Sequence, residues 1–171
     1  VQDIEGKLPF ALLGCDCDNG SEFLNHHLWS YLVQRQRPVA FTRSRPYKKN
    51  DNAHVEQKNW THVRQLLGYD RFENPQLVAL LNNLYAQEWQ AYQNFFCPSV
   101  KLVEKKRIGA KYHKRYDKAQ TPYQRLLAFT LDPTKHRQLA QEFAKLNPFK
   151  LKKTIESKLK AIFDANKVPP R

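Results

Sequence analysis

The sequence has few cysteines, no long apolar run and no internal repeat. Its three cysteines, Cys15, Cys17 and Cys97, lack any C-x₂-C spacing, which suggests neither a disulfide framework nor a zinc finger. We expect Cys15 and Cys17 to pack as small apolar side chains at a strand end. No apolar stretch approaches the length of a membrane-spanning helix, and no signal-peptide pattern opens the chain. A membrane is therefore not expected as a partner.

Acidic residues are also scarce. There are 29 Lys and Arg against 16 Asp and Glu in 171 residues, giving a net charge of +13 and a pI near 9.8. Such an excess indicates a polyanionic partner, and nucleic acid is the first choice because neutralising phosphates releases counterions. On charge alone, a membrane surface would be a weaker choice of polyanion, and solubility is the simplest interpretation of the excess. The length suits one domain or parts of two.

The first part of the chain predicts a strand, a helix and a second strand. The strand is expected over 10–17, with its continuous apolar run buried on both faces. The helix follows from Ser21 to about Gln36, and the second strand covers 39–42. This order favours a right-handed parallel crossover, hence an α/β unit. Asp18 would then lie at the carboxyl end of the first strand, with Asp16 as a supporting polar residue.

A second carboxylate lies on the next expected helix, from about Asn52 to Leu67. Asn50-Asp51-Asn52 resembles a helix cap, and Glu56 falls in or near the first turn. Glu56 begins a stripe that we expect to pack on the sheet, continued by Trp60, Val63 and Leu67. A strand-end carboxylate and a helix carboxylate can converge on one divalent cation, because Mg²⁺ prefers hard oxygen ligands.

Two segments in this region, Asp18-Asn19-Gly20-Ser21-Glu22-Phe23 and Asn52-Ala53-His54-Val55-Glu56-Gln57-Lys58-Asn59, carry a family resemblance. The chain resembles the integrase-type transposases of bacterial insertion sequences, relatives of retroviral integrases that use two Asp and one Glu. The 37 residues between Asp18 and Glu56 are close to the family's usual spacing. The resemblance implies that Asp18 is the second and Glu56 the third catalytic carboxylate. Both would be ligands of Mg²⁺ or Mn²⁺ in a two-metal site that forms only in the complete protein.

The resemblance also implies a ribonuclease-H-like core whose first three strands and first catalytic Asp would precede Val1. We therefore expect a C-terminal part only, α/β in class and a partial ribonuclease-H-like fold. It would be weakly stable alone because strand edges stay unpaired. In the complete protein, two metals would support DNA cleavage and strand transfer without a covalent enzyme intermediate. The isolated chain is expected to be inactive as an enzyme, and the complete protein to be a homo-oligomer acting on element ends and target DNA.

Several basic residues are predicted to contact DNA. A loop before the Glu56 helix carries Arg43, Arg45, Lys48 and Lys49, and a solvated loop is the alternative interpretation. The resemblance adds Lys58 and His62 on the helix itself. The segment 98–120 is expected to be an extended basic connector that lies on DNA through Lys105, Lys106, Arg107 and Lys111, with a solvated linker as the alternative.

The expected organisation is a catalytic-core half over 1–97, the basic connector over 98–120 and a helical region over 121–171. Asn74-Pro75 predicts the start of a long helix that closes the first part. Thr121-Pro122, Asp132-Pro133 and Asn147-Pro148 predict the starts of three more, because each pairs an N-cap residue with proline at the first helical position.

The function predicted first is thus a fragment of a DNA transposase, cytoplasmic and associated with the nucleoid. The alternative is a non-catalytic nucleic-acid-binding remnant of a transposase. A ribosome-associated basic protein would fit the charge but would leave the two motifs unexplained. Metal-dependent strand cleavage separates the first two functions, whereas salt-sensitive binding does not, because both predict it.

Overall fold

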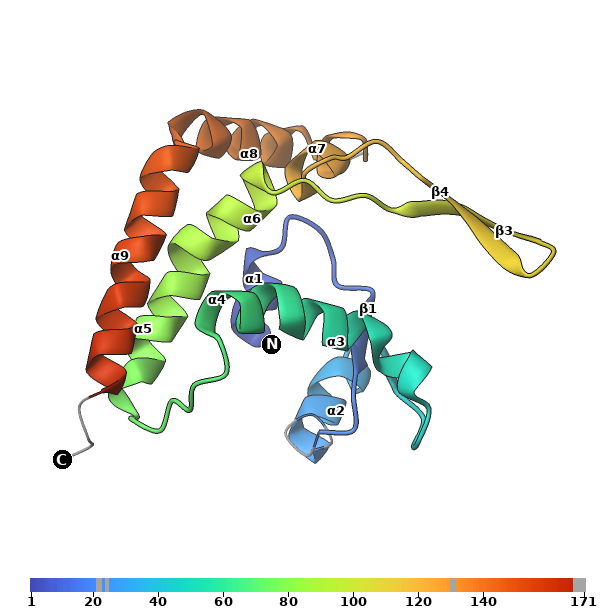
Figure 1. Cartoon of the computed structure of the whole chain (residues 1–171), viewed down its shortest axis with the longest axis horizontal. Helices are drawn as coiled ribbons and strands as arrows, with labels where there is room; N and C mark the ends of the chain where they lie inside the picture. The colour runs from blue at the N-terminus through green and yellow to red at the C-terminus, as the bar shows by residue number, and fades with distance from the viewer. Residues whose placement is uncertain (21–22, 24, 130–131, 168–171) are drawn as a thin grey trace. The chain divides into compact units, whose positions relative to one another are not determined.

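The computed structural model describes residues 1–20, 23, 25–129 and 132–167 of the chain (Figure 1). The fold is mixed α/β, as predicted. It divides into two compact units, Val1–Asp70 and Arg71–Arg171, which we describe separately. The division falls after Asp70, whereas the sequence suggested one after Cys97. The long helix that follows Asn74-Pro75 therefore belongs with the C-terminal helices.

In the first unit, β1 (Gly14–Cys17) pairs in parallel with β2 (Ala40–Arg43), and α2 (His26–Val33) connects them. The parallel strand–helix–strand order is confirmed. Gly14 lies opposite Ala40 and Cys17 opposite Arg43.

The first strand is shorter than predicted, and its burial on both faces was wrong. Phe10 and Leu13 are 51% and 81% exposed and precede the strand, and within β1 only Cys17 is buried. An apolar run becomes a doubly buried strand only where elements cover both faces, and in the described chain this sheet has two strands. Ser21, Glu22 and Leu24, at the predicted start of the helix, lie outside the described residues. The described α2 begins at His26, where the Asn25 side chain accepts a hydrogen bond from the Leu28 amide at 2.8 Å.

The first residues of the chain form a short helix. This helix, α1 (Gln2–Lys7), is joined to the end of α2 through Glu5. The Glu5 carboxylate accepts hydrogen bonds from two Arg35 nitrogens, at 2.7 and 2.9 Å, and from the Tyr31 hydroxyl at 2.5 Å. These hydrogen bonds lower the pKa of Glu5 to about 2. A bidentate arginine contact of this kind fixes orientation as well as charge.

The helix predicted over residues 52–67 is present as one continuous helical run. It starts as the 3₁₀ turn η1 (Lys49–Asn52) and continues through α3 (Ala53–Asn59), the π turn η2 (Trp60–Arg64) and α4 (Gln65–Leu67). Gly68 ends it with a φ of +72°, a conformation that favours glycine.

The second unit is built on a long helical run and a C-terminal helix beside it. The run consists of α5 (Gln76–Leu84), the π turn η3 (Tyr85–Trp89) and α6 (Gln90–Phe96). The C-terminal helix α9 (Pro148–Asn166) lies along α5 (Figure 1). The buried side chains of the two helices include Leu77, Leu84, Ile155 and Ile162. Lys158 of α9 also donates to Asn83 at 2.5 Å and to Glu88.

Two shorter helices, α7 (Pro122–Leu127) and α8 (Pro133–Lys145), complete this unit. The three predicted N-caps are confirmed, because Thr121, Asp132 and Asn147 each accept a backbone N–H of the first turn. Aromatic rings join the helices: the Phe143 ring centroid lies 5.1 Å from that of Tyr123 and 5.9 Å from that of Phe95.

The segment predicted as an extended connector is instead an antiparallel hairpin of β3 (Leu102–Ile108) and β4 (Lys111–Tyr116). Ile108 pairs with Lys111, so the turn is the two residues Gly109-Ala110, with Gly109 at φ +60°. A two-residue turn of this kind matches the twist of the two strands. It requires a positive φ at its first residue, which glycine adopts most easily. The strands stand clear of the helices of their own unit (Figure 1), and nearly every residue in them is exposed.

Among the residues that the structure describes, no helix is both long and apolar enough to cross a membrane.

Candidate functional site

Asp18 directly follows β1, at the carboxyl end of the strand, as predicted. Its side chain is half-buried, and its Oδ1 accepts the Gly20 N–H at 3.0 Å. This contact closes an Asx turn, the local role that an Asp before Asn-Gly commonly has. The turn holds the carboxylate in one orientation and occupies only one of its two oxygens.

Asp16 lies on the same strand but has a different partner. Its Oδ1 accepts the Thr42 hydroxyl at 2.8 Å, across the parallel pair from β1 to β2. The prediction that Asp16 is a supporting polar residue agrees with this cross-strand bond.

Glu56 is the fourth residue of α3, and its side chain is exposed. Of the stripe that we expected to pack on the sheet, only Leu67 is buried; Trp60 and Val63 are 50% and 37% exposed. The expected packing of this face was therefore wrong for the described chain. Within the part of the chain that the structure describes, no hydrogen bond or ion pair orients the Glu56 carboxylate, whereas the Gly20 N–H orients that of Asp18.

The donor chemistry of Asp18 and Glu56 suits a hard divalent cation, since both supply carboxylate oxygens. Within the described ranges, no group of three or more His, Cys, Asp or Glu side chains comes together that could hold a metal ion.

The basic loop between β2 and α3 is organised by an ion pair that the sequence analysis missed. Arg45 donates to both oxygens of Asp51, at 2.8 and 3.0 Å, and its backbone N–H donates to the same carboxylate. These hydrogen bonds lower the pKa of Asp51 to about 2. Asp51 therefore closes the loop instead of capping the helix as predicted, and its carboxylate balances the positive charge of Arg45.

The other predicted cations of this loop differ in position. Arg43 ends β2 and Lys48 is exposed just before η1, while Lys49 begins η1 and its side chain lies outside what is described. Arg43 lines an open hollow of about 440 Å³ together with aromatic and polar residues, namely Phe23, Asn25, His26, Trp29 and Phe41.

Lys58 and His62 lie one turn apart in the helical run, as predicted. Lys58 is exposed, whereas His62 is half-buried. Burial, and secondarily the charge of Lys58, lowers the pKa of His62 below its ordinary value. The lowered pKa makes His62 harder to protonate, so its ring is less suited than the Lys58 ammonium to contact a phosphate.

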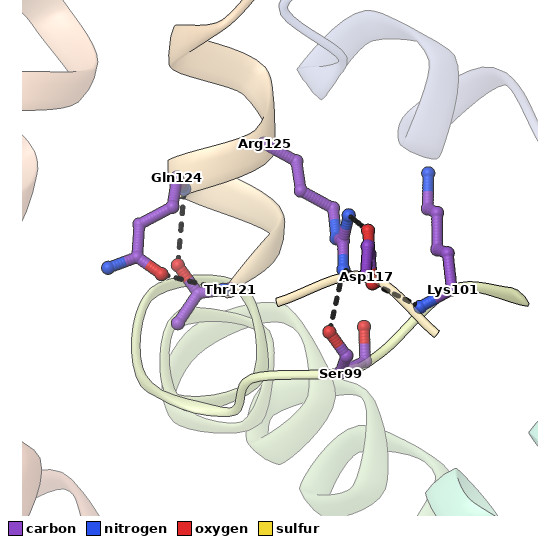
Figure 2. A network of polar contacts seen from close by, with 6 residues as sticks. All are labelled: Ser99, Lys101, Asp117, Thr121, Gln124 and Arg125. Carbon is purple, nitrogen blue, oxygen red and sulfur yellow. Dashed lines mark hydrogen bonds and ion pairs between the residues drawn. The ribbon is translucent and has the colours of Figure 1, made fainter. Parts of the chain in front are cut away.

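The base of the β3–β4 hairpin is held by a network of polar contacts (Figure 2). Arg125 of α7 donates to the Asp117 carboxylate at 2.6 and 3.2 Å and to the Ser99 carbonyl at 2.7 Å. Asp117 also accepts the Lys101 N–H at 2.6 Å. Thr121 and Gln124 form a reciprocal capping box beside them. Both ends of the hairpin are thus tied to the first turns of α7.

The four predicted cations of this segment fall on opposite faces of the hairpin. Lys105 and Arg107 lie on one face, whereas Lys106 and Lys111 lie on the other, because side chains alternate along a strand. Lys114 and Tyr112 share the face of Lys105, although neither was among the four predicted DNA contacts. Gly109-Ala110 between two runs of strand-forming residues was the signal that could have revealed the hairpin.

The chain is similar to a protein without an assigned function. The "Uncharacterized protein y4rM" of Sinorhizobium fredii (strain NBRC 101917 / NGR234) is 45% identical over 117 residues, which is 68% of this chain. The match spans only 33% of the length of that relative. No protein-family profile matches the chain, and no solved structure matches it.

Proposed function

We propose that the chain is the C-terminal part of an integrase-type DNA transposase with a ribonuclease-H-like core. The observation that carries this proposal is Asp18, in the segment DNGSEF, directly after a strand that pairs in parallel with the next strand along the chain. The helical run with Glu56 follows that second strand. This is the order of elements in which such a core presents two of its carboxylates.

When bound, Mg²⁺ or Mn²⁺ would supply charge stabilisation for phosphoryl transfer, and Asp18 and Glu56 are the residues that would hold it. Asp18 offers the oxygen that the Gly20 N–H leaves open. The basic loop and the β3–β4 hairpin would contact the DNA backbone. The complete protein would act as a homo-oligomer on element ends and target DNA, in association with the nucleoid.

The test is metal-dependent nicking of DNA by the complete protein that contains this chain. Asp18→Asn and Glu56→Gln should each abolish nicking and leave DNA binding unchanged. Asn keeps an oxygen that can accept the Gly20 N–H, and Gln is as good a helix former as Glu at an exposed position. Each change therefore removes the charge while keeping the local fold.

Asp16→Asn is the matched control, because it neutralises a carboxylate on the same strand that already accepts the Thr42 hydroxyl. It should nick at the normal rate. Normal nicking by Asp18→Asn or Glu56→Gln would refute the assignment of these carboxylates.

The exposed basic hairpin favours a second candidate, a nucleic-acid-binding protein without catalysis. That function needs the hairpin and not the carboxylates. It predicts salt-sensitive DNA binding with no metal-dependent cleavage, even by the complete protein.

A further inference from the structure

The two faces of the β3–β4 hairpin differ in how their charges are balanced. The paired face carries Lys106, Lys111 and Arg115 together with Glu104 and His113. Glu104 forms ion pairs with Lys106 at 2.7 Å and with Arg115 at 3.3 Å. Glu104 thus balances the charge of two of the three cations on this face of the hairpin.

The basic face carries Lys105, Arg107 and Lys114 with Tyr112 and Tyr116. Residues 102–116 are all described, and no acidic side chain shares this face with the three cations. Lys105 lies directly opposite Lys114 in the register. Like charges in direct cross-strand register destabilise a hairpin, so folding alone does not account for this pair.

The tyrosines add flat ring surface among these cations. The Lys105 ammonium lies 4.5 Å from the centroid of the Tyr112 ring, and Tyr112 and Tyr116 are 55% and 49% exposed. The Arg107 Nε donates to the Gly109 carbonyl at 3.1 Å, which orients the guanidinium near the turn. The side chains that would meet a ligand are therefore partly ordered before it arrives.

We infer that the basic face of this hairpin binds the phosphate backbone of duplex DNA, and that the paired face does not. The inference rests on the proposed function and specifies which surface contacts the DNA. The positive charge of the basic face is complementary to a polyanion. Its three cations, with no acidic side chain among them, offer successive contacts to the phosphates along a DNA backbone. A two-stranded β-ribbon also fits the width of the DNA major groove. The ion pair between Asp117 and Arg125 at the base of the hairpin would keep the two strands at a fixed angle to α7.

Two matched triple variants of the full chain test the inference. Lys105→Gln/Arg107→Gln/Lys114→Gln changes the basic face, and Lys106→Gln/Lys111→Gln/Arg115→Gln changes the paired face. Each set replaces two lysines and one arginine, so both lower the net charge equally. Affinity for one duplex would be measured by fluorescence anisotropy over a series of salt concentrations.

The basic-face variant should bind at least tenfold more weakly. The slope of log K against log salt should become shallower by about 2.7, because each lost phosphate contact removes about 0.9. The paired-face variant should change affinity less than about threefold. Equal losses in the two variants, or a larger loss in the paired-face variant, would overturn the face assignment while leaving DNA binding intact.

A wild-type chain that binds no DNA would overturn this inference and the DNA-binding part of the proposed function together. Tighter binding to single-stranded DNA or RNA than to the duplex would overturn the choice of duplex.

Folding of the variants is checked by denaturation, where the basic-face variant should be at least as stable as wild type because the Lys105–Lys114 repulsion is gone. An independent measurement needs no variant: NMR signals of the Lys105 and Lys114 side chains should shift on DNA addition, and those of Lys106 and Lys111 should not.

Discussion

Arg125 donates to both carboxylate oxygens of Asp117, from Nη1 at 2.6 Å and from Nη2 at 3.2 Å. The two side chains belong to different elements, since Asp117 follows β4 and Arg125 lies in α7. Their ion pair, with the Ser99 carbonyl and the Lys101 N–H, is what joins the exposed hairpin to the helices of its unit.

We predict that the titration of Asp117 depends on this arginine. In the wild type, the Arg125 hydrogen bonds, with that of the Lys101 N–H, lower the pKa of Asp117 to about 2. In Arg125→Gln it should rise toward the ordinary value of about 3.9. Because the folded-state pKa is lowered, the contribution to stability is complete above about pH 4 and is lost as the pH falls through about 2. NMR of the carboxyl carbon measures this, and an unchanged midpoint in the variant would contradict it.

The capping box at the start of α7 should contribute measurably to stability. Thr121 Oγ1 accepts the Gln124 N–H at 3.1 Å, and Gln124 Oε1 accepts the Thr121 N–H at 2.9 Å. Thr121→Ala should lower the free energy of unfolding by about 1 kcal/mol. Thr121→Ser keeps the hydroxyl and should lose much less. Urea denaturation of both variants decides, and an equal loss in the two would argue against the cap.

The core of the second unit should be sensitive at Leu84, whose side chain is fully buried. Leu84→Ala removes apolar contacts and leaves a cavity, so it should cost about 2–5 kcal/mol of unfolding free energy. Val78→Ala on the same helix is the control, because Val78 is exposed and the change should stay within about 0.5 kcal/mol. Similar values for the two would show that α5 is not packed as described.

Glu5 should be the residue that holds α1 in the first unit. Glu5→Gln removes the charge that pairs with Arg35, so amides of residues 2–7 should exchange faster with deuterium. Asp3→Asn on the same helix breaks only an exposed pair with Lys7 and should leave exchange nearly unchanged. Equal acceleration in the two variants would contradict the role of Glu5.

The parts of the fold that the sequence predicted are those determined by neighbours along the chain. Thr121, Asp132 and Asn147 were recognised because an N-cap and a following proline act within one turn. The parallel pairing of 14–17 with 40–43 followed from the order of elements and from the rule that crossovers join parallel strands.

The hairpin was missed because its strands carry no hydrophobic alternation. Lys105 and Lys106 follow each other on opposite faces that are both exposed, so the period of two leaves no trace in hydropathy. Because the hairpin was not predicted, the sequence identified a basic segment but did not show which of its cations share one face of the two strands. The pairing of Arg45 with Asp51 was equally hidden, because both residues fitted other roles, a DNA contact and a helix cap.

The register that places Lys105 opposite Lys114 makes ionic strength act in opposite directions on the hairpin and on its proposed ligand. Added salt screens the repulsion between the two ammonium groups, which favours the folded ribbon. The same salt weakens attachment to a polyanion, because counterions released from the DNA gain less entropy when the surrounding solution already holds more salt. The salt that relieves the Lys105–Lys114 repulsion is therefore the same salt that loosens the proposed hold on DNA.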